Sequence, residues 1–476
     1  MNVTVLYVGS SLLGPLRNAE RELNRAYKLD LRVAAYNFGS PLSDREWLEV
    51  EADLKAANIV FVIHVMDGEN ATRLISALDK SNHDAVIVIN CMPELMRRTR
   101  MRRLDIASFK GQNGKGGKLL RSVGSWVGNH ARRGKSDKRS HTQYLKLVDR
   151  LPGILQFVPT AGALTDAKHY LYLFCYFLQP TPANIQSMLL YSLVHYVPDQ
   201  RLKKVRVPKP EQMPSVAIYH PKARALFRSF AAYRKWYGKP LDPDKTIGLL
   251  LMRPQVISKT TRHYDALINS IEAEGLSVIP AIATLMDNRE AVAKFFVEPA
   301  KSKARVSQIV SLTGFSFVGG PAMNDSAAAA EFLRELNLPY RSAVSLDTQT
   351  IEAWGDSATG LNPVQAGMQI AIPEIDGATE PFIYGGIPSR GHEPVALDDR
   401  CRRLARRLKR WHRLQSASRD QVKLAIVLFC FPPNKGNIGT AADLDVFPGL
   451  FDVLKRLRDE GYTVAVPDSI DHLRDS

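Results

Sequence analysis

The chain has 476 residues, of which 45% are hydrophobic and 24% are charged, and its formal net charge at pH 7 is +16. This length and composition indicate a globular protein of several domains and exclude a disordered or fibrous chain. The four scattered cysteines form no C-x-x-C pair, and the longest apolar run, Tyr170–Leu178, is too short to cross a bilayer. We therefore expect a soluble, cytoplasmic protein.

Residues 1–110 are predicted to form an N-terminal α/β domain. Apolar runs predict buried strands, and helical patterns, one after Leu16 and one at Asp44–Ala57, alternate with them. Strands separated by helices indicate parallel βαβ units. His64 falls within a predicted strand, where we expect a satisfied core imidazole. The predicted strands are Asn2–Val8, Leu31–Ala35, Ile59–Val65 and Ala85–Asn90.

Residues 111–141 are predicted to be a basic, flexible loop, because Gly, Lys, Arg and Ser cannot bury a core. Between Leu95 and His141 the sequence has fourteen Lys and Arg residues and only two Asp residues. An acidic membrane surface, an acidic partner protein and plain solvation all fit this charge. Nucleic acid is disfavoured, since few aromatics accompany the charge. Gly111–Lys118 fails the Walker A pattern, so we expect no ATP use by this chain itself.

Residues 142–205 are predicted to be helical, through Gln143–Leu151, Asp166–Leu178 and Ala183–Tyr196, with a proline-rich linker at Pro198–Pro214. Residues 206–420 return to α/β alternation, and residues 421–476 are predicted to begin a further α/β domain. The fold class is therefore α/β, with several doubly wound parallel-sheet domains and an intervening helical segment. The strands predicted here are Val216–Tyr219, Thr246–Met252, Ser277–Ala281, Gln308–Leu312, Met368–Ile372, Lys423–Phe429 and Thr463–Val466.

The stretch FPPNKGNIGTAADLDVF, from Phe431 to Phe447, separates an apolar run from a predicted helix. Pro432 and Pro433 end the strand, and the glycines allow close backbone approach where the helix begins. Ligands bind at such strand-to-helix turns in α/β sheets, and a helix N-terminus favours an anion. The same pattern also fits a plain strand–helix connection.

This stretch resembles a segment shared by the porphyrin-binding H subunits of magnesium chelatases and the large subunits of aerobic cobaltochelatases. Five further blocks resemble the same family in the same order, and the first of them leans towards the magnesium enzymes. These blocks are Met92–Phe109, Leu250–Tyr264, Ser311–Ala322, Pro339–Trp354 and Gly360–Gly386.

The resemblance implies a porphyrin-binding protein that takes Mg²⁺ and protoporphyrin IX as substrates in (bacterio)chlorophyll synthesis, with ATP used by partner ATPase subunits. The alternatives are a cobaltochelatase large subunit acting on a corrin precursor and a non-catalytic tetrapyrrole-binding protein. The family's Gly-Thr-His-Gly-type block with its downstream glutamate is absent from this sequence. We therefore expect a fragment, a frameshifted gene or a split subunit, leave the enzymatic status open and assign no catalytic residue.

Candidate substrate-binding residues follow the predicted strands. They are Asn434, Lys435 and Asn437 in the 431–447 turn, and Arg253 and His263 after the strand Thr246–Met252. Lys435 is expected to bind a porphyrin carboxylate in a cleft shared with Arg253 or His263 and the Gly319–Gly320 turn, although His263 also fits a surface-facing helix position. Glu374, Asp376 and Glu380 fit either a proton-accepting or Mg²⁺-binding group or an acid-rich turn. The histidines show no ligand spacing, so no resident metal site is predicted.

Overall fold

The computed structural model describes residues 1–107 and 163–475, except residues 10, 40, 67, 91, 284–286, 299–302, 320–323, 392 and 440–443. The chain forms two compact units, Met1–Ala405 and Arg406–Ser476. The basic loop predicted at residues 111–141 and the helix predicted at Gln143–Leu151 lie outside the described residues. No helix in the described part of the chain is both long and apolar enough to cross a membrane.

The first sheet is mostly parallel, and all four strands predicted for it form. Its order is β2-β1-β3-β4-β5-β6, with parallel pairing from β2 to β4 and antiparallel pairing beyond. Val3 is the register partner of both Val33 and Ile59. The strands are β1 (Asn2–Tyr7), β2 (Arg32–Asn37), β3 (Ile59–Ile63), β4 (Ala85–Ile89), β5 (Arg100–Met101) and β6 (Leu104–Asp105).

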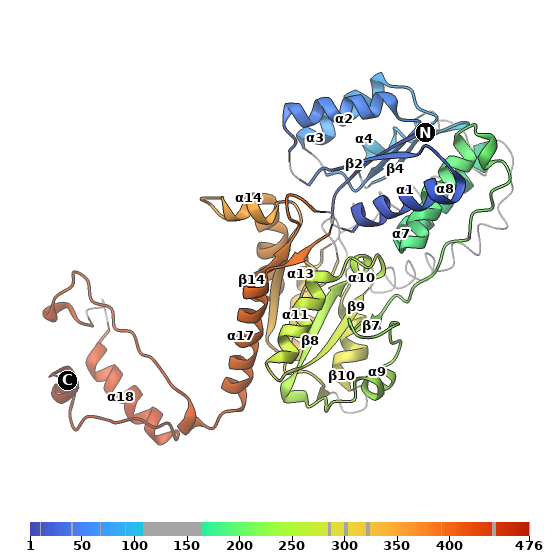
Figure 1. Cartoon of the computed structure of the whole chain (residues 1–476). Coiled ribbons are helices and arrows are strands. Elements are labelled where there is room, and N and C mark those ends of the chain that lie inside the picture. Colours follow the sequence, from blue (N-terminus) through green and yellow to red (C-terminus); the bar gives the residue numbers. More distant parts are fainter. Residues whose placement is uncertain are drawn as a thin grey trace. The chain divides into compact units, whose positions relative to one another are not determined.

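Helices cover both faces of this sheet, which is why β3 (IVFVI) and β4 (AVIVI) are buried along their whole length. Val5, Phe61 and Ile87 share one core with α1 (Leu13–Tyr27), α7 (Ala163–Leu178) and α8 (Pro182–Tyr196). Residues of opposite parity form the other core with α2 (Asp44–Ala56) and α3 (Glu69–Lys80) (Figure 1). The short helix α4 (Pro93–Met96) follows β4.

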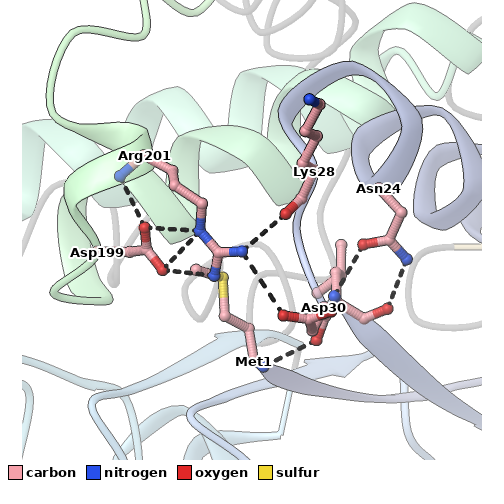
Figure 2. A network of polar contacts seen from close by, with 7 residues as sticks. Met1, Asn24, Lys28, Asp30, Asp199 and Arg201 are labelled. Carbon is pink, nitrogen blue, oxygen red and sulfur yellow. Dashed lines mark hydrogen bonds and ion pairs between the residues drawn. The ribbon is translucent and has the colours of Figure 1, made fainter.

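The helical hairpin α7–α8 is anchored through the segment that follows α8, which contacts the chain between α1 and β2. The Thr181 side chain caps α8 by accepting from Asn184 N, and Pro182 occupies the first turn. Beyond α8, Arg201 donates to the carbonyl of Lys28 at 2.7 Å and pairs with Asp199, while the chain's N-terminal amine donates to Asp30 O at 2.9 Å (Figure 2). The hairpin is therefore part of the first lobe, by which we mean the first sheet and the helices that cover it.

The second sheet has the order β15-β14-β13-β12-β8-β9-β7, with five parallel strands and antiparallel β7 and β15 at its edges. The short hairpin β10 (Val297–Glu298) and β11 (Lys303–Ala304) stands apart from it. The strands are β7 (Ala217–Ile218), β8 (Thr246–Met252), β9 (Ser277–Ala283), β12 (Gln308–Ser311), β13 (Tyr340–Leu346), β14 (Thr379–Gly386) and β15 (Val395–Ala396).

Helices connect these strands, so the predicted α/β class with an intervening helical segment is confirmed. The helices of this region are α9 (Phe230–Tyr237), α10 (Arg253–Ile257), α11 (Arg262–Ala273), α12 (Arg289–Ala291), α13 (Ser326–Leu336), α14 (Ile351–Gly355), α15 (Pro363–Ala366) and α16 (Ile372–Asp376). The helix α17 (Asp398–Ser416) carries a second cluster of basic residues, which includes Arg402, Arg406 and Arg410, and these residues are exposed.

The strand predicted at Met368–Ile372 is wrong, because these residues are helical. Asn362 caps the helical stretch by accepting from Gln365 N, and Pro363 occupies its first turn. The alternating Met368, Ile370 and Ile372 suggested a strand, but this capped start comes before them, and they continue the helical stretch as far as α16.

The second unit contains α18 (Val446–Asp459) and α19 (Ile470–Asp475), and the helix predicted after the 431–447 turn is confirmed. The strands predicted at Lys423–Phe429 and Thr463–Val466 do not form within the described residues. Leu424, Val427 and Phe429 are 53%, 90% and 65% exposed. Among the described residues the only bridge beside this apolar run joins Cys430 to Ile438.

Candidate functional site

The second sheet reverses its strand order at β8, which places a topological switch point between β8 and β12. The chain leaves β8 for β9 on one side and returns to β12 on the other. In open α/β sheets ligands bind outside the carboxyl ends of the strands at such a point. Arg253 follows β8, Thr313 follows β12 and Asp347 follows β13, so these residues mark the carboxyl edge where a ligand is expected.

Arg253 lies at this edge, but its side chain is directed into the protein. The residue is 6% exposed. Its guanidinium donates to the carbonyls of Pro214 and Met213 and to Gln179 Oε1, each at 3.0 Å. Arg253 therefore ties the end of β8 to the linker before β7 and to the end of α7. These contacts give it a structural role.

His263 is completely buried on α11, so the surface-facing helix position considered for it is wrong. Its ring lies against Tyr264, with centroids 3.9 Å apart, and stacks near Tyr384 at 5.9 Å. Nε2 lies 3.2 Å from Gln255 Oε1, whereas Nδ1 has no hydrogen-bond partner among the described residues. Burial lowers the pKa of His263 to about 3, so the imidazole is neutral at pH 7.

Gln255 organises the centre of this edge. Its Oε1 accepts from Tyr264 Oη as well as contacting His263, and Tyr264 Oη also accepts from Met252 N at 3.3 Å. One amide oxygen thus orients two rings at the end of β8. Burial raises the pKa of Tyr264 far above its ordinary value, so the phenol keeps its proton.

Asp347 is the acid of the edge, directly after β13. It accepts from Gln369 Nε2 at 3.1 Å, and burial of its carboxyl group raises its pKa to about 6. Gly314, with φ of +69°, lies so close to Gln369 that a Cβ would stand 3.0 Å from Nε2. A Cβ on Gly39, in the turn after β2, would stand 3.2 Å from Thr348 Cα and 3.5 Å from Asp347 O. The carboxyl ends of both sheets therefore border on Asp347.

The three acids considered as a proton-accepting or Mg²⁺-binding group do not converge. Glu380 pairs with Arg341 at 2.6 Å, and Glu374 is exposed. Asp376 is fully buried, and its Oδ2 accepts from Ser316 Oγ and Phe317 N, both at 2.7 Å. Their environments support the interpretation of an acid-rich turn, in which Asp376 fixes the loop after β12. No metal-binding cluster of His, Cys, Asp and Glu occurs among the described residues.

His64, expected inside a strand, lies just past the end of β3. Its φ is +53°, and its ring meets the edge of Phe177 with centroids 5.2 Å apart. The residue is partly exposed, while burial lowers the pKa of its imidazole. The prediction that His64 lies within the strand is therefore wrong. The strand ends at Ile63 because His64 turns into the left-handed region.

The 431–447 turn belongs to the second unit. Asn434 precedes a single 3₁₀ turn, Asn437 N donates to Asn434 O at 3.1 Å, and Asn437 Nδ2 donates to Pro432 O at 2.8 Å. Both asparagines thus hold the turn, while the side chain of Lys435 lies outside the described part of the structure. The cleft predicted between Lys435 and Arg253 or His263 would join the two units and stays a prediction.

The family model described as CobN/Magnesium Chelatase matches residues 174–476. The chain belongs to this family. Residues 2–171 match a second model, described as a domain of unknown function, DUF3479. The boundary between the two matched regions falls within α7.

Two magnesium-chelatase relatives match nearly the whole chain. The chloroplastic magnesium-chelatase subunit ChlH of Oryza sativa subsp. japonica is 34% identical over 433 residues, which cover 89% of this chain and 30% of that protein. The magnesium-chelatase H subunit of Rhodobacter capsulatus is 31% identical over 504 residues, which cover 100% of this chain and 40% of that protein. The chain thus spans well under half of either relative.

The cobaltochelatase matches are weaker. Aerobic cobaltochelatase subunit CobN of Pseudomonas aeruginosa is 28% identical over 269 residues, which cover 54% of this chain and 20% of that protein. The solved catalytic subunit of cobaltochelatase from Mycobacterium tuberculosis aligns over 99% of this chain and 32% of that chain, at 18% identity and a TM-score of 0.48.

Sequence reasoning located the edge after β8 but missed most of its polar residues, namely Gln255, Tyr264, Asp347, Gln365 and Gln369. A signal for Asp347 was present, since this acid directly follows the apolar end of a strand. The glutamines carried no such signal. Gln365, for example, accepts at a single Oε1 from Thr348 N and Thr348 Oγ1, and only the folded chain reveals that contact.

Proposed function

We propose that this chain is the tetrapyrrole-handling part of a magnesium chelatase large subunit. In this role it binds protoporphyrin IX, and Mg²⁺ is inserted with ATP hydrolysed by separate ATPase subunits. The observation that carries the proposal is the share of this chain that its relatives match. The two magnesium-chelatase relatives match 89% and 100% of the chain. The cobaltochelatase relative matches 54%. The same role implies (bacterio)chlorophyll synthesis in the cytoplasm, with the basic region as a contact for membrane or partner.

The arrangement of polar groups suits support of a bound macrocycle better than proton transfer. Neutral His263 and protonated Tyr264 are buried, and the guanidinium of Arg253 already donates to the carbonyl of Pro214 in the linker. A porphyrin dicarboxylate needs an apolar surface with cations at its margin. We keep Lys435, with Asn434 and Asn437 holding its turn, as a proposed contact for one carboxylate.

Porphyrin selectivity tests this function. The intact chain is titrated with protoporphyrin IX and, in parallel, with dicyanocobinamide as a corrin, and binding is followed by tryptophan fluorescence quenching. We expect saturable porphyrin binding at least about ten-fold tighter than corrin binding, a difference of roughly 1.4 kcal/mol. Tighter binding of the corrin would favour the cobaltochelatase assignment and contradict the proposal.

Replacing Lys435 by Ala tests the proposed carboxylate contact. A charge-assisted bond contributes on the order of 1.5–3 kcal/mol, so porphyrin binding should weaken about ten-fold or more while thermal stability stays nearly unchanged. Unchanged binding in K435A would remove Lys435 from the site and leave the proposed function standing.

A further inference from the structure

The α7–α8 hairpin carries a cluster of aromatic rings that its packing buries only in part. Tyr172 and Tyr191 pack against the core and keep part of their surface exposed. Tyr170, Tyr176 and Leu193 are buried in the core of the first lobe. Four of its half-buried rings contact one another, and we call them the aromatic face: His169 and Tyr172 on α7, and Tyr191 and His195 on α8.

The rings of the aromatic face form one continuous surface. The centroids of His169 and His195 are 4.0 Å apart, those of Tyr191 and His195 are 4.3 Å apart, and those of Tyr172 and Tyr191 are 5.8 Å apart. The interplanar angles of these pairs lie between 34° and 55°, and the rings of His169 and Tyr191 are nearly perpendicular, at 89°. The tilted rings therefore offer edge and face π contacts to a ligand rather than a flat platform.

A hydrogen-bonded chain holds this face in place. His169 Nδ1 lies 3.2 Å from Tyr196 Oη, which donates to Asp166 Oδ1 at 2.9 Å. Asp166 Oδ2 accepts from Arg103 N at 3.0 Å. Asp166 is only 5% exposed, so the carboxylate nearest the rings is used inside the protein.

The charge at the margin of the aromatic face is positive. The Arg103 contact fixes the turn between β5 and β6, where Arg102 is exposed and its guanidinium carbon lies 5.7 Å from the centroid of the Tyr196 ring. Burial, reinforced by the charge of Arg102, lowers the pKa of both His169 and His195. Both imidazoles are therefore neutral at pH 7, and Lys168 adds a second cation on α7.

We propose that the aromatic face, with Arg102 at its margin, is a docking site for a porphyrin that carries carboxylate side chains. The rings contact the macrocycle, and Arg102 binds a carboxylate through a charge-assisted hydrogen bond. Aromaticity and negative charge are the two properties that this surface complements together. The inference rests on the proposed function, and it places a tetrapyrrole contact at the boundary of the DUF3479 region.

The test compares ring removal with ring retention in the full chain. Deuteroporphyrin IX, a soluble dicarboxylate porphyrin, is the probe, and the dissociation constant is measured from its absorbance and from tryptophan quenching. The double variant Y191A/H195A should weaken binding at least about ten-fold, whereas Y191F, which keeps the ring, should bind within about two-fold of the parent. Thermal unfolding shows whether each variant is folded.

Adjacent arginines supply the matched control for charge. R102A should weaken deuteroporphyrin binding about three- to ten-fold, and R103A should leave it unchanged, because Arg103 contacts the site through its backbone. With the dimethyl ester of the same porphyrin, which lacks the negative charges, R102A and the parent should bind alike. Equal binding of the acid by R102A and R103A would contradict the charge contact.

The outcomes separate the two proposals. If the parent binds deuteroporphyrin and folded Y191A/H195A binds it equally well, the aromatic face is not the site and the proposed function survives. If Y191F weakens binding as much as Y191A/H195A, the phenol hydroxyl rather than the ring is responsible and the inference of a ring contact fails. If the folded parent binds no porphyrin, both proposals fall.

Discussion

At the residue scale, the candidate site shows buried polar side chains whose partners are distant in sequence. Arg253 and His263 were selected because they follow a predicted strand, and both do lie beside the carboxyl end of β8. Their burial could not be predicted, since Arg253 is bonded to residues 179, 213 and 214, and His263 stacks near Tyr384. Local spacing indicates the position of such groups and leaves their contacts undetermined.

Asp376 should be far more important for stability than Glu374, two residues earlier on the same helix. Asp376→Ala leaves Phe317 N without its buried acceptor, whereas Ser316 Oγ keeps Val318 O, so the free energy of unfolding should fall by about 1–3 kcal/mol. Glu374→Ala is the matched control and should change it by less than about 0.5 kcal/mol. Urea unfolding measures both, and similar values for the two variants would contradict this assignment.

His263 should make stability depend on pH. Its pKa is lowered from 6.5 to about 3 in the folded chain, so the unfolded chain binds a proton first as the pH falls. The stability contribution is complete above pH 6.5 and is lost progressively towards pH 3. Between about pH 6 and 4, the parent should therefore lose about 1.4 kcal/mol per pH unit more than His263→Phe does. Parallel pH profiles for the two proteins would show that this imidazole titrates normally.

At the element scale, continuous apolar runs predicted the strands of the first sheet, whereas β13 and β14 were missed. The sequence YRSAVSL of β13 contains Arg341, which is 2% exposed and donates to Glu380 Oε2 at 2.6 Å and Gln308 Oε1 at 2.7 Å. These partners satisfy a charge that a strand pattern would exclude. Conversely, the apolar run at Lys423–Phe429 forms no strand, because an apolar pattern cannot supply neighbouring strands.

Substitutions of valine in these two segments should behave in opposite ways. Val427 is 90% exposed, so Val427→Lys should change the free energy of unfolding by less than about 0.5 kcal/mol. Val344, in β13, is fully buried, and Val344→Lys should unfold the first unit or cost several kcal/mol. Thermal unfolding followed by circular dichroism distinguishes them. Strong destabilisation by V427K would show that the 423–429 segment is buried in solution.

At the whole-molecule scale, two mostly parallel sheets and the helical hairpin provide the framework, and the family resemblance read from ordered blocks is confirmed by the family match. The framework explains why candidate residues gather at strand ends, as the switch point between β8 and β12 shows. The domain boundaries predicted at residues 110, 141, 205 and 420 stay predictions. Along the chain, the first compact unit ends at Ala405 and the second begins at Arg406.

The measurement that tests the central claim most directly is an equilibrium titration of the intact chain with deuteroporphyrin IX, followed by isothermal calorimetry and porphyrin absorbance together. We predict saturable porphyrin binding. The spectral shift and the heat should reach their plateaus at the same molar ratio of porphyrin to chain. A folded chain that gives neither heat nor a spectral change with porphyrin would contradict the proposal that it handles tetrapyrroles.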